Sequence, residues 1–462
     1  MRQLNTTTFE LHFGDYEFFK AQGYAILSHR WIGAEVNFEQ IQKYGPEMRE
    51  ATETSFQQDK IRGACATARE LGYQWIWIDN CCINKASATE ESESINSMFK
   101  WYRNAQVCIT YLSDVRLDAT SGPAPYEAAD ASLSMSVTRK HIKNAPAIFQ
   151  SIDGLGSSKW FSRGWTLQEL LAPREMRFYD SVWKLMGTKV SLASEIESIT
   201  GIAVPYLIGT QDFRKACVAT KMSWMAGRTT GREEDIAYSM LGLFKIMMVP
   251  RYGEGQRAFL RLQQELLSTS TDESIFAWKM PQHTSGKQYE LEPSRDTVWA
   301  ADEWGLLAPT PDWFKDCGQF SIEEGNTIQR PINAMQAMQL GVGIKLIPLG
   351  FKGKYIALNI LGTLTILGGL PTFLYTAKRH MKKAMEGLPY PLNCWTRDEA
   401  GSLVKVSIFL KPAAQLTFGM EQPFKMKRMK CSELLFSHDQ TGKATHQPQD
   451  AIVLQPHLRY DD

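Results

Sequence analysis

A glutamate in an aromatic setting is the first residue of this sequence whose type and position suggest chemistry. The segment WFSRGWTLQELLAPREMRFYD, residues 160–180, crowds aromatic rings around a short polar turn, and Glu169 falls in the first turn of the helix expected next. A fixed carboxylate stabilises positive charge that develops in a transition state. The same residues also spell a capping box, T-x-x-E, in which Thr166 and Glu169 each accept from the other's backbone N–H. Spacing alone favours the cap, and both interpretations stay open.

Polar residues also follow three expected strands at the points where the strands end. Ser28-His29-Arg30-Trp31 follows an apolar strand at 24–27, Asp79-Asn80-Cys81-Cys82 follows a strand at 75–78, and Ser113-Asp114 follows a strand at 106–112. Open α/β sheets bind ligands beyond the carboxyl ends of their strands, so the clustering indicates a binding site. Each residue also has a structural interpretation: Asp79 and Ser113 can cap a loop or helix, and a lone histidine such as His29 is most often structural.

A thiol nucleophile is a third alternative for this edge of the sheet. His29 would meet Cys81 or Cys82 across neighbouring strand ends if the two residues formed a cysteine–histidine pair. No segment resembles a nucleophile elbow or a cysteine-protease signature, so the sequence disfavours this chemistry.

The elements that must position these residues alternate between strand and helix over residues 1–190. Apolar spacing predicts helices at 60–71 and 90–104, and a further strand at 175–179 follows the segment that carries Glu169. This alternation predicts an open α/β sheet flanked by helices. Residues 191–275 have helical spacing, as at 235–244 and 256–267, and predict a helical extension. Residues 276–462 have short β-branched runs, as at 342–347 and 404–410, and predict a β-rich C-terminal domain.

Composition and charge exclude several classes of protein. The 462 residues are 44% hydrophobic and 22% charged, with a formal net charge of +1, so no global field favours nucleic acid. The eight cysteines have no metal-ligand spacing, and the N-terminus has no apolar signal region; both predict a reduced, cytoplasmic protein without a metal site. Residues 355–377 are uncharged and long enough to span a bilayer, but their Asn, Gly and Pro content favours two buried strands.

Three blocks of the sequence resemble the signature blocks of the fungal HET (heterokaryon incompatibility) domain. They are YAILSHRW at 24–31, the run GYQWIWIDNCCINK to YLSDV at 72–115, and the segment at 160–180; residues 228–278 resemble the segment that commonly follows. Lys85 departs from the family pattern, which often has Gln at that position. The resemblance implies a role in fungal non-self recognition and in programmed cell death.

A more distant resemblance, to the TIR domain, implies a mechanism. TIR domains have a flavodoxin-like sheet and a W-C-x-x-E-L helix, which Trp165-Thr166-Leu167-Gln168-Glu169-Leu170 is similar to, with Thr166 in place of Cys. The alignment puts Glu169 at the glutamate that NAD-cleaving TIR domains use. It implies NAD as a substrate, with no separate cofactor, and ring stacking or phosphate contacts from nearby side chains such as Trp31 and Arg30. The substrate-binding residues expected on these grounds are Ser28, His29, Arg30, Trp31, Asp79, Asn80, Cys82, Ser113 and Trp165.

Two functions therefore follow as expectations. The first is a death-signalling protein whose TIR-like HET domain hydrolyses NAD at the nicotinamide–ribose bond through Glu169. The alternative is a non-catalytic module that signals by self-association and recruits partners through the same surfaces. In both cases the TIR resemblance implies a homo-oligomer formed through the HET domain, with a protein partner in incompatibility signalling, no nucleic acid and no membrane span.

Overall fold

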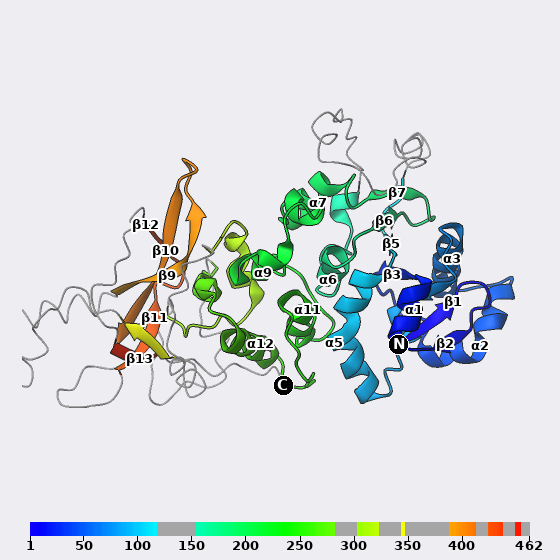
Figure 1. Cartoon of the computed structure of the whole chain (residues 1–462), viewed down its shortest axis with the longest axis horizontal. Helices are drawn as coiled ribbons and strands as arrows, with labels where there is room; N and C mark the ends of the chain where they lie inside the picture. Colours follow the sequence, from blue (N-terminus) through cyan, green and yellow to red (C-terminus); the bar gives the residue numbers. More distant parts are fainter. Residues whose placement is uncertain are drawn as a thin grey trace, which may run out of the picture. The chain divides into compact units, whose positions relative to one another are not determined.

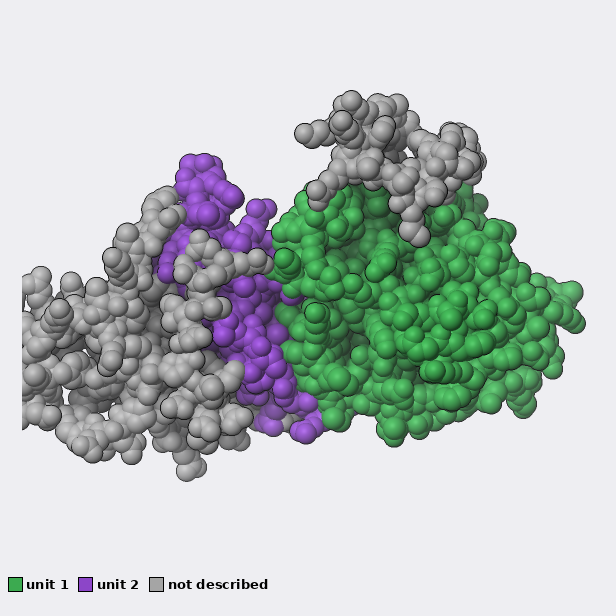
Figure 2. All heavy atoms as spheres, viewed as in Figure 1, with its two compact units in different colours: residues 1–215, 228–250 green, residues 216–227, 251–462 purple. Residues whose placement is uncertain are grey.

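The structure is a computed structural model, and it describes residues 1–117, 154–281, 303–322, 343–346, 388–412, 424–437 and 449–453. The chain forms two compact units: residues 1–215 with 228–250, and residues 216–227 with 251–462 (Figure 2). Residues 191–275, expected as a separate helical extension, divide between the two units.

The first unit is built on a seven-stranded sheet with the order β2-β1-β4-β3-β5-β6-β7 (Figure 1). The inner strands β4, β3, β5 and β6 are parallel, whereas β1, β2 and β7 join antiparallel at the edges. The parallel-rich sheet flanked by helices confirms the α/β class that the sequence predicts. The strands are β1 (Arg2–Asn5), β2 (Leu11–Phe13), β3 (Ala25–His29), β4 (Trp75–Trp77), β5 (Val107–Tyr111), β6 (Met176–Tyr179) and β7 (Leu185–Thr188).

Helices lie on both sides of this sheet. In Figure 1, α5 and α6 lie to one side of β3 and β5, and α3 lies to the other. The predicted helix at 235–244 is interrupted at Ser239 and Met240, so it forms two short helices. The helices of the unit are α1 (Tyr16–Gln22), α2 (Phe38–Glu50), α3 (Phe56–Glu70), α4 (Asp79–Cys82), α5 (Ala88–Asn104), α6 (Thr166–Leu171), α7 (Ala193–Thr200), α8 (Val204–Leu207), α10 (Asp235–Tyr238) and α11 (Leu241–Phe244), with short 3-10 helices η2 (Leu155–Ser157) and η3 (Phe213–Lys215).

Aromatic packing and one close approach hold the helices against the sheet. The Trp77 ring of β4 packs on Trp101 and Tyr102 of α5, with ring centroids 5.4 and 5.8 Å apart. The Tyr102 hydroxyl then donates to the carbonyl of Leu27 on β3 at 2.8 Å. On α3, a Cβ at Gly63 would lie 2.1 Å from the Trp183 indole, so only glycine lets the helix come this close. These contacts hold α5 against β3 and β4 and bring α3 close to Trp183.

The second unit combines short helices with a six-stranded sheet. Three of its tryptophans form a buried cluster: the Trp313 ring lies 4.8 Å from Trp278 and 5.6 Å from Trp304. The expected strands at 342–347 and 404–410 are present as β8 and β10. The elements are α9 (Val218–Ser223), α12 (Arg257–Thr269), η4 (Glu273–Phe276), η6 (Pro311–Cys317), β8 (Gly343–Leu346), β9 (Leu388–Arg397), β10 (Leu403–Pro412), β11 (Phe424–Met429), β12 (Leu435–Ser437) and β13 (Gln449–Val453).

The strands of the second sheet pair antiparallel except for β11 with β13, which are parallel. In the part of the chain that the structure describes, no helix is both long and apolar enough to span a bilayer. The uncharged segment 355–377 lies outside the described residues.

Candidate functional site

Strand β3 brings two polar residues to the carboxyl edge of the sheet. Ser28 lies beside Thr110 and His29 beside Tyr111 of the parallel strand β5, and both β3 residues are buried. Successive side chains of a strand point to opposite faces. Ser28 and His29 therefore join different polar clusters, one on each face.

The first cluster, here the Glu169 cluster, contains Ser28, Trp160, Glu169, Thr166 and Arg228. The Ser28 hydroxyl donates to Glu169 Oε2 at 2.5 Å, and the Trp160 indole N–H donates to Ser28 Oγ at 2.9 Å. Helix α6 places Glu169 so that only 7% of the residue is exposed. The carboxyl group is thus held by a strand far away in the sequence.

The capping box expected at the start of α6 does not form. Thr166 Oγ1 donates to the carbonyls of Trp160 and Arg163, at 2.7 and 2.8 Å. The residue before the helix, Trp165, has helical backbone angles, and no side chain caps this end. The physical reason is burial. Both residues of the pattern lie inside the protein, where the Thr166 hydroxyl and the Glu169 carboxyl form hydrogen bonds with other residues instead of capping the helix.

Arg228 locks the segment in front of α6 from a distant part of the chain. Its Nη1 donates to the Arg163 carbonyl at 3.0 Å and to Thr166 Oγ1 at 3.1 Å. Around it, the Gly164 N–H donates to the Thr229 carbonyl at 2.8 Å, and the Thr229 N–H donates to the Ser162 carbonyl at 2.7 Å. Arg228 was not among the residues expected from the sequence, where its only signal was its place at the start of the HET-like segment.

The other end of α6 is held by a buried lysine. Lys189 Nζ donates to the carbonyls of Leu170 and Pro173, at 3.0 and 2.6 Å. An ammonium group at the carboxyl end of a helix satisfies carbonyls that have no partner within the helix. Burial lowers the pKa of Lys189 to about 8. Helix α6 is therefore fixed at both ends by cationic side chains.

The environment of Glu169 keeps its carboxyl group protonated at neutral pH. Its pKa is raised from 4.5 to about 8, mainly by burial and to a smaller extent by the charge of Asp79. The hydrogen bond from Ser28 and the charges of Arg163 and Arg228 act in the opposite direction, but they do not offset burial. Burial also lowers the pKa of Arg228, to about 10.

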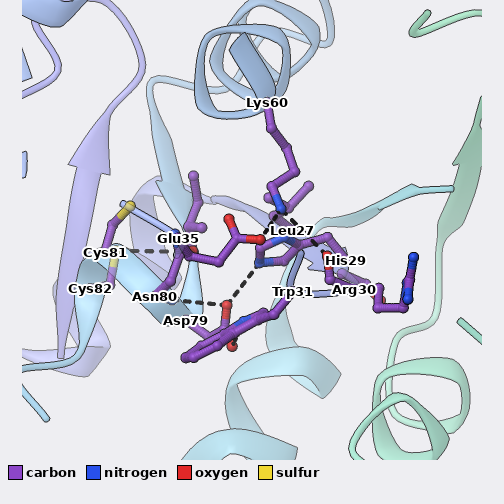
Figure 3. A network of polar contacts seen from close by, with 12 residues as sticks. Leu27, His29, Arg30, Trp31, Glu35, Lys60, Asp79, Asn80, Cys81 and Cys82 are labelled. Atoms are coloured by element: carbon purple, nitrogen blue, oxygen red, sulfur yellow. Dashed lines mark hydrogen bonds and ion pairs between the residues drawn. The ribbon is translucent and has the colours of Figure 1, made fainter. Parts of the chain in front are cut away.

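The second cluster, here the Asp79 cluster, lies on the His29 side of β3 (Figure 3). His29 Nε2 lies 2.9 Å from Asp79 Oδ1, and the Trp31 indole N–H donates to Asp79 Oδ2 at 2.9 Å. The Asn80 backbone N–H donates to Oδ1 at 2.8 Å. Burial by itself would raise the pKa of Asp79, but the hydrogen bonds with His29 and Trp31 and the nearby charges of His29 and Lys85 lower it to about 2.

A buried ion pair fixes the loop that carries Trp31. Lys60 Nζ of α3 lies 2.5 Å from Glu35 Oε1, and both side chains are almost fully buried. The same Glu35 oxygen accepts from the Ile32 N–H at 2.7 Å, and Lys60 Nζ also donates to the Arg30 carbonyl at 3.4 Å. The loop is pinned on either side of Trp31, as Figure 3 shows.

The structure brings together part of the expected residue set. Ser28 joins Glu169, and His29, Trp31 and Asp79 meet as the sequence predicts. The Asn80 side chain instead donates to the Val36 carbonyl at 2.7 Å. Within the described ranges, the Arg30 side chain, Ser113 and Trp165 form no hydrogen bond with either cluster, so their expected roles in binding stay predictions.

The thiol alternative does not fit this geometry. Cys81 Sγ faces the Val36 carbonyl at 3.5 Å, and Cys82 Sγ accepts from the Ile78 N–H at 3.4 Å. Burial raises the pKa of Cys82 to about 12, and His29 is engaged with Asp79. A thiolate is therefore disfavoured at this edge. Among the residues described, no three His, Cys, Asp or Glu side chains are grouped so as to hold a metal ion.

Comparison with known proteins identifies two regions. The model of the heterokaryon incompatibility protein (HET) family matches residues 24–169, and a domain of unknown function (DUF8212) matches residues 257–339. The chain is 36% identical over 252 residues to the vegetative incompatibility protein HET-E-1 of Podospora anserina, an alignment that covers 54% of this chain and 16% of that protein. No solved structure matches the chain significantly.

Proposed function

The chain carries a HET domain at residues 24–169, and from this premise we propose that it acts in heterokaryon incompatibility by cleaving NAD in that domain. The similarity to a vegetative incompatibility protein supports the first part, a role in heterokaryon incompatibility. The alignment covers only 16% of that relative, so the proposal concerns the HET domain and its chemistry.

The strand order supports a TIR-like interpretation of this domain. The four parallel strands lie side by side in the sheet in the order β4-β3-β5-β6. Numbered by their order along the chain, this is second, first, third, fourth. That is the flavodoxin-like order, in which ligands bind where the first and third parallel strands diverge at their carboxyl ends. Here those strands are β3 and β5, and Ser28 lies at the end of β3.

The observation that carries the proposal is the position of the Glu169 carboxyl group. It is not used to cap its own helix; it is bound to Ser28, at the carboxyl end of the central strand. A second carboxylate, Asp79, follows the neighbouring strand and stays ionised while Glu169 is protonated. Pairs of acids whose pKa values are pushed apart by their surroundings are typical of sites that do acid–base or electrostatic catalysis.

The chemistry uses Glu169 in its ionised form. The nicotinamide ring of NAD is a cation, and a cation placed next to Glu169 lowers the pKa of that carboxyl group, so substrate binding favours loss of its proton. The bond between the ribose C1′ and the ring nitrogen then breaks, and its electron pair goes to the ring, which leaves as neutral nicotinamide. The carboxylate stabilises the oxocarbenium-like sugar until water adds at C1′ and releases a proton.

The test is NAD loss and nicotinamide release by the purified full chain, with Glu169→Gln and the matched variant Glu175→Gln. Glu175 pairs with Arg177 at the surface, and its side chain is 45% exposed. We expect Glu169→Gln to reduce the rate at least about 10²-fold and Glu175→Gln to leave it unchanged. The wild-type kcat/KM should rise with pH up to about 8, where free Glu169 ionises.

Two results would overturn this function. One is a folded wild-type protein that releases no nicotinamide even at high concentration, and the other is a Glu169→Gln variant that remains active. The first result would favour the alternative, a non-catalytic module that signals by self-association, and the second would show that residues other than Glu169 carry the chemistry. Sedimentation of the folded chain over a range of concentrations would then test whether copies associate through the HET domain.

A further inference from the structure

Trp31 presents a fixed aromatic face beside an ionised carboxylate. Its indole N–H donates to Asp79 Oδ2 at 2.9 Å, and the Lys60–Glu35 ion pair holds the loop on either side. Trp31 itself is only half-buried. An indole that is anchored through its N–H and keeps part of its surface accessible is a preformed stacking platform.

The side chain of Lys85 covers a face of this indole. Its ammonium nitrogen lies 3.6 Å from the centre of the Trp31 ring, in the position of a cation–π contact. Lys85 is an exposed residue of the turn between α4 and α5. A lysine side chain in such a turn can leave the ring without disturbing a helix or a strand.

The charges around Lys85 favour a cation at this place. The carboxylates of Asp79, Glu91 and Asp235 are close enough to stabilise its ammonium charge, and the guanidinium of Arg232 opposes them. Taken together these charges favour a cation, whereas burial, the larger effect, lowers the pKa of Lys85. A cation that takes the place of the ammonium group would meet the same charges.

We propose that the Trp31 face is the binding site for the cationic nicotinamide ring, and that Lys85 occupies it as a built-in competitor which the substrate displaces. A pyridinium ring is planar and positively charged, so it can stack on the indole and also meet the negative surroundings. The identity of the ring rests on the proposed function; the site for a planar aromatic cation does not.

Binding without catalysis tests the site. Calorimetry of the full chain with the 1-methylnicotinamide cation, and with neutral nicotinamide as the uncharged control, measures the preference for charge. We expect Lys85→Met to bind the cation about two- to fivefold more tightly than wild type, the fold-change that corresponds to ~0.5–1 kcal/mol of cation–π attraction. Trp31→Leu should remove binding of the cation, with its fold checked by circular dichroism.

Lys100→Met is the matched control, because Lys100 is also an exposed lysine whose ammonium lies over a ring, that of Tyr16, at 4.1 Å. This variant should bind the cation as wild type does. The proposal is overturned if Lys85→Met binds no more tightly than Lys100→Met, if neutral nicotinamide binds as well as the cation, or if the folded Trp31→Leu variant still binds.

Kinetics then separate this inference from the proposed function. If the chain cleaves NAD, Lys85→Met should lower KM by a similar factor and leave kcat unchanged, because it removes a competitor and touches no reacting atom. If the chain binds the cation but never cleaves NAD, the site stands and the proposed function fails. If it cleaves NAD while KM is the same in Lys85→Met and wild type, the function stands and Lys85 is no competitor.

Discussion

Two helices of the first unit begin with the same kind of pattern and use it differently. At α3, Ser55 Oγ accepts from the Gln58 N–H at 3.3 Å and Gln58 Oε1 accepts from the Ser55 N–H at 2.8 Å, so the capping box is complete. At α6, Thr166 and Glu169 have the equivalent spacing, but neither side chain caps the helix. Ser55 is exposed, whereas Thr166 and Glu169 are 1% and 7% exposed.

The difference teaches that burial decides how such a pattern is used. At the surface, only water competes for the hydrogen bonds of each capping group, and the local capping box forms. In the interior, a carboxyl or hydroxyl group without a hydrogen-bond partner lowers the free energy of unfolding by about 1–3 kcal/mol. At α6, distant residues such as Ser28 and Arg228 supply the partners. Changes to the Thr166 and Glu169 side chains of α6 should therefore affect folding stability through tertiary contacts, and changes to the capping residues Ser55 and Gln58 of α3 only through the helix itself.

Ser28→Ala should give the largest effect in this comparison. It removes the partner of two buried groups, Glu169 Oε2 and the Trp160 indole N–H. We expect a loss of about 3 kcal/mol in the free energy of unfolding, because both groups stay buried without a partner. Urea denaturation measures it. A loss below about 1 kcal/mol would show that water or another side chain replaces the hydroxyl.

The pH dependence of stability should be the next largest effect. The folded protein keeps the Glu169 proton up to about pH 8, whereas the unfolded chain releases it near pH 4.5. The contribution of this proton is therefore complete below pH 4.5 and is lost as the pH rises toward 8. Asp79 titrates near pH 2, outside this window.

Between pH 5 and pH 6.5 the wild type should lose about 2 kcal/mol of stability relative to Glu169→Gln, whose side chain does not titrate. Urea denaturation of both proteins at a series of pH values measures this difference. If the free energies of unfolding of the two proteins changed in parallel with pH, Glu169 would be ionised in the folded protein, and the cationic groups around it would outweigh the effect of burial on its pKa.

Thr166→Val should have a smaller effect, about 1.5 kcal/mol. The hydroxyl that is lost bonds to the Trp160 and Arg163 carbonyls, but the Arg163 carbonyl still accepts from Arg228. Thr166→Ser keeps the hydroxyl and should recover most of the loss. If the serine and valine variants were equally unstable, packing of the methyl group rather than hydrogen bonding would account for the change.

The sequence predicts the frame of the site well, because that frame depends on local patterns. Apolar runs and helical spacing place β3, β4, β5, α3 and α5 to within a few residues, and the polar residues that end β3 and β4 do meet. The contacts that the sequence does not predict join residues far apart in the chain. The bond from Trp160 to Ser28 and the contact of Arg228 with α6 join segments far apart in the chain, and no periodicity signals them.

Glu169 shows why a local rule can fail at such a place. Its spacing from Thr166 is correct for a capping box, and only the burial of α6 overrides it. Sequence periodicity predicts which face of a long helix is buried, but α6 has only six residues and is buried on all sides. The edge strands β1 and β2 were missed for a similar reason, since strands this short carry little alternation.

Ser55→Ala should give the smallest effect and completes the comparison. It removes one exposed cap from α3, where water can solvate the freed N–H groups, and we expect a loss of about 0.5–1 kcal/mol. Ser55→Asp keeps an acceptor at the helix start and should stay within about 0.5 kcal/mol of wild type. Urea denaturation ranks both against Ser28→Ala. If Ser55→Ala proved as costly as Ser28→Ala, burial would not be what separates the two helix starts.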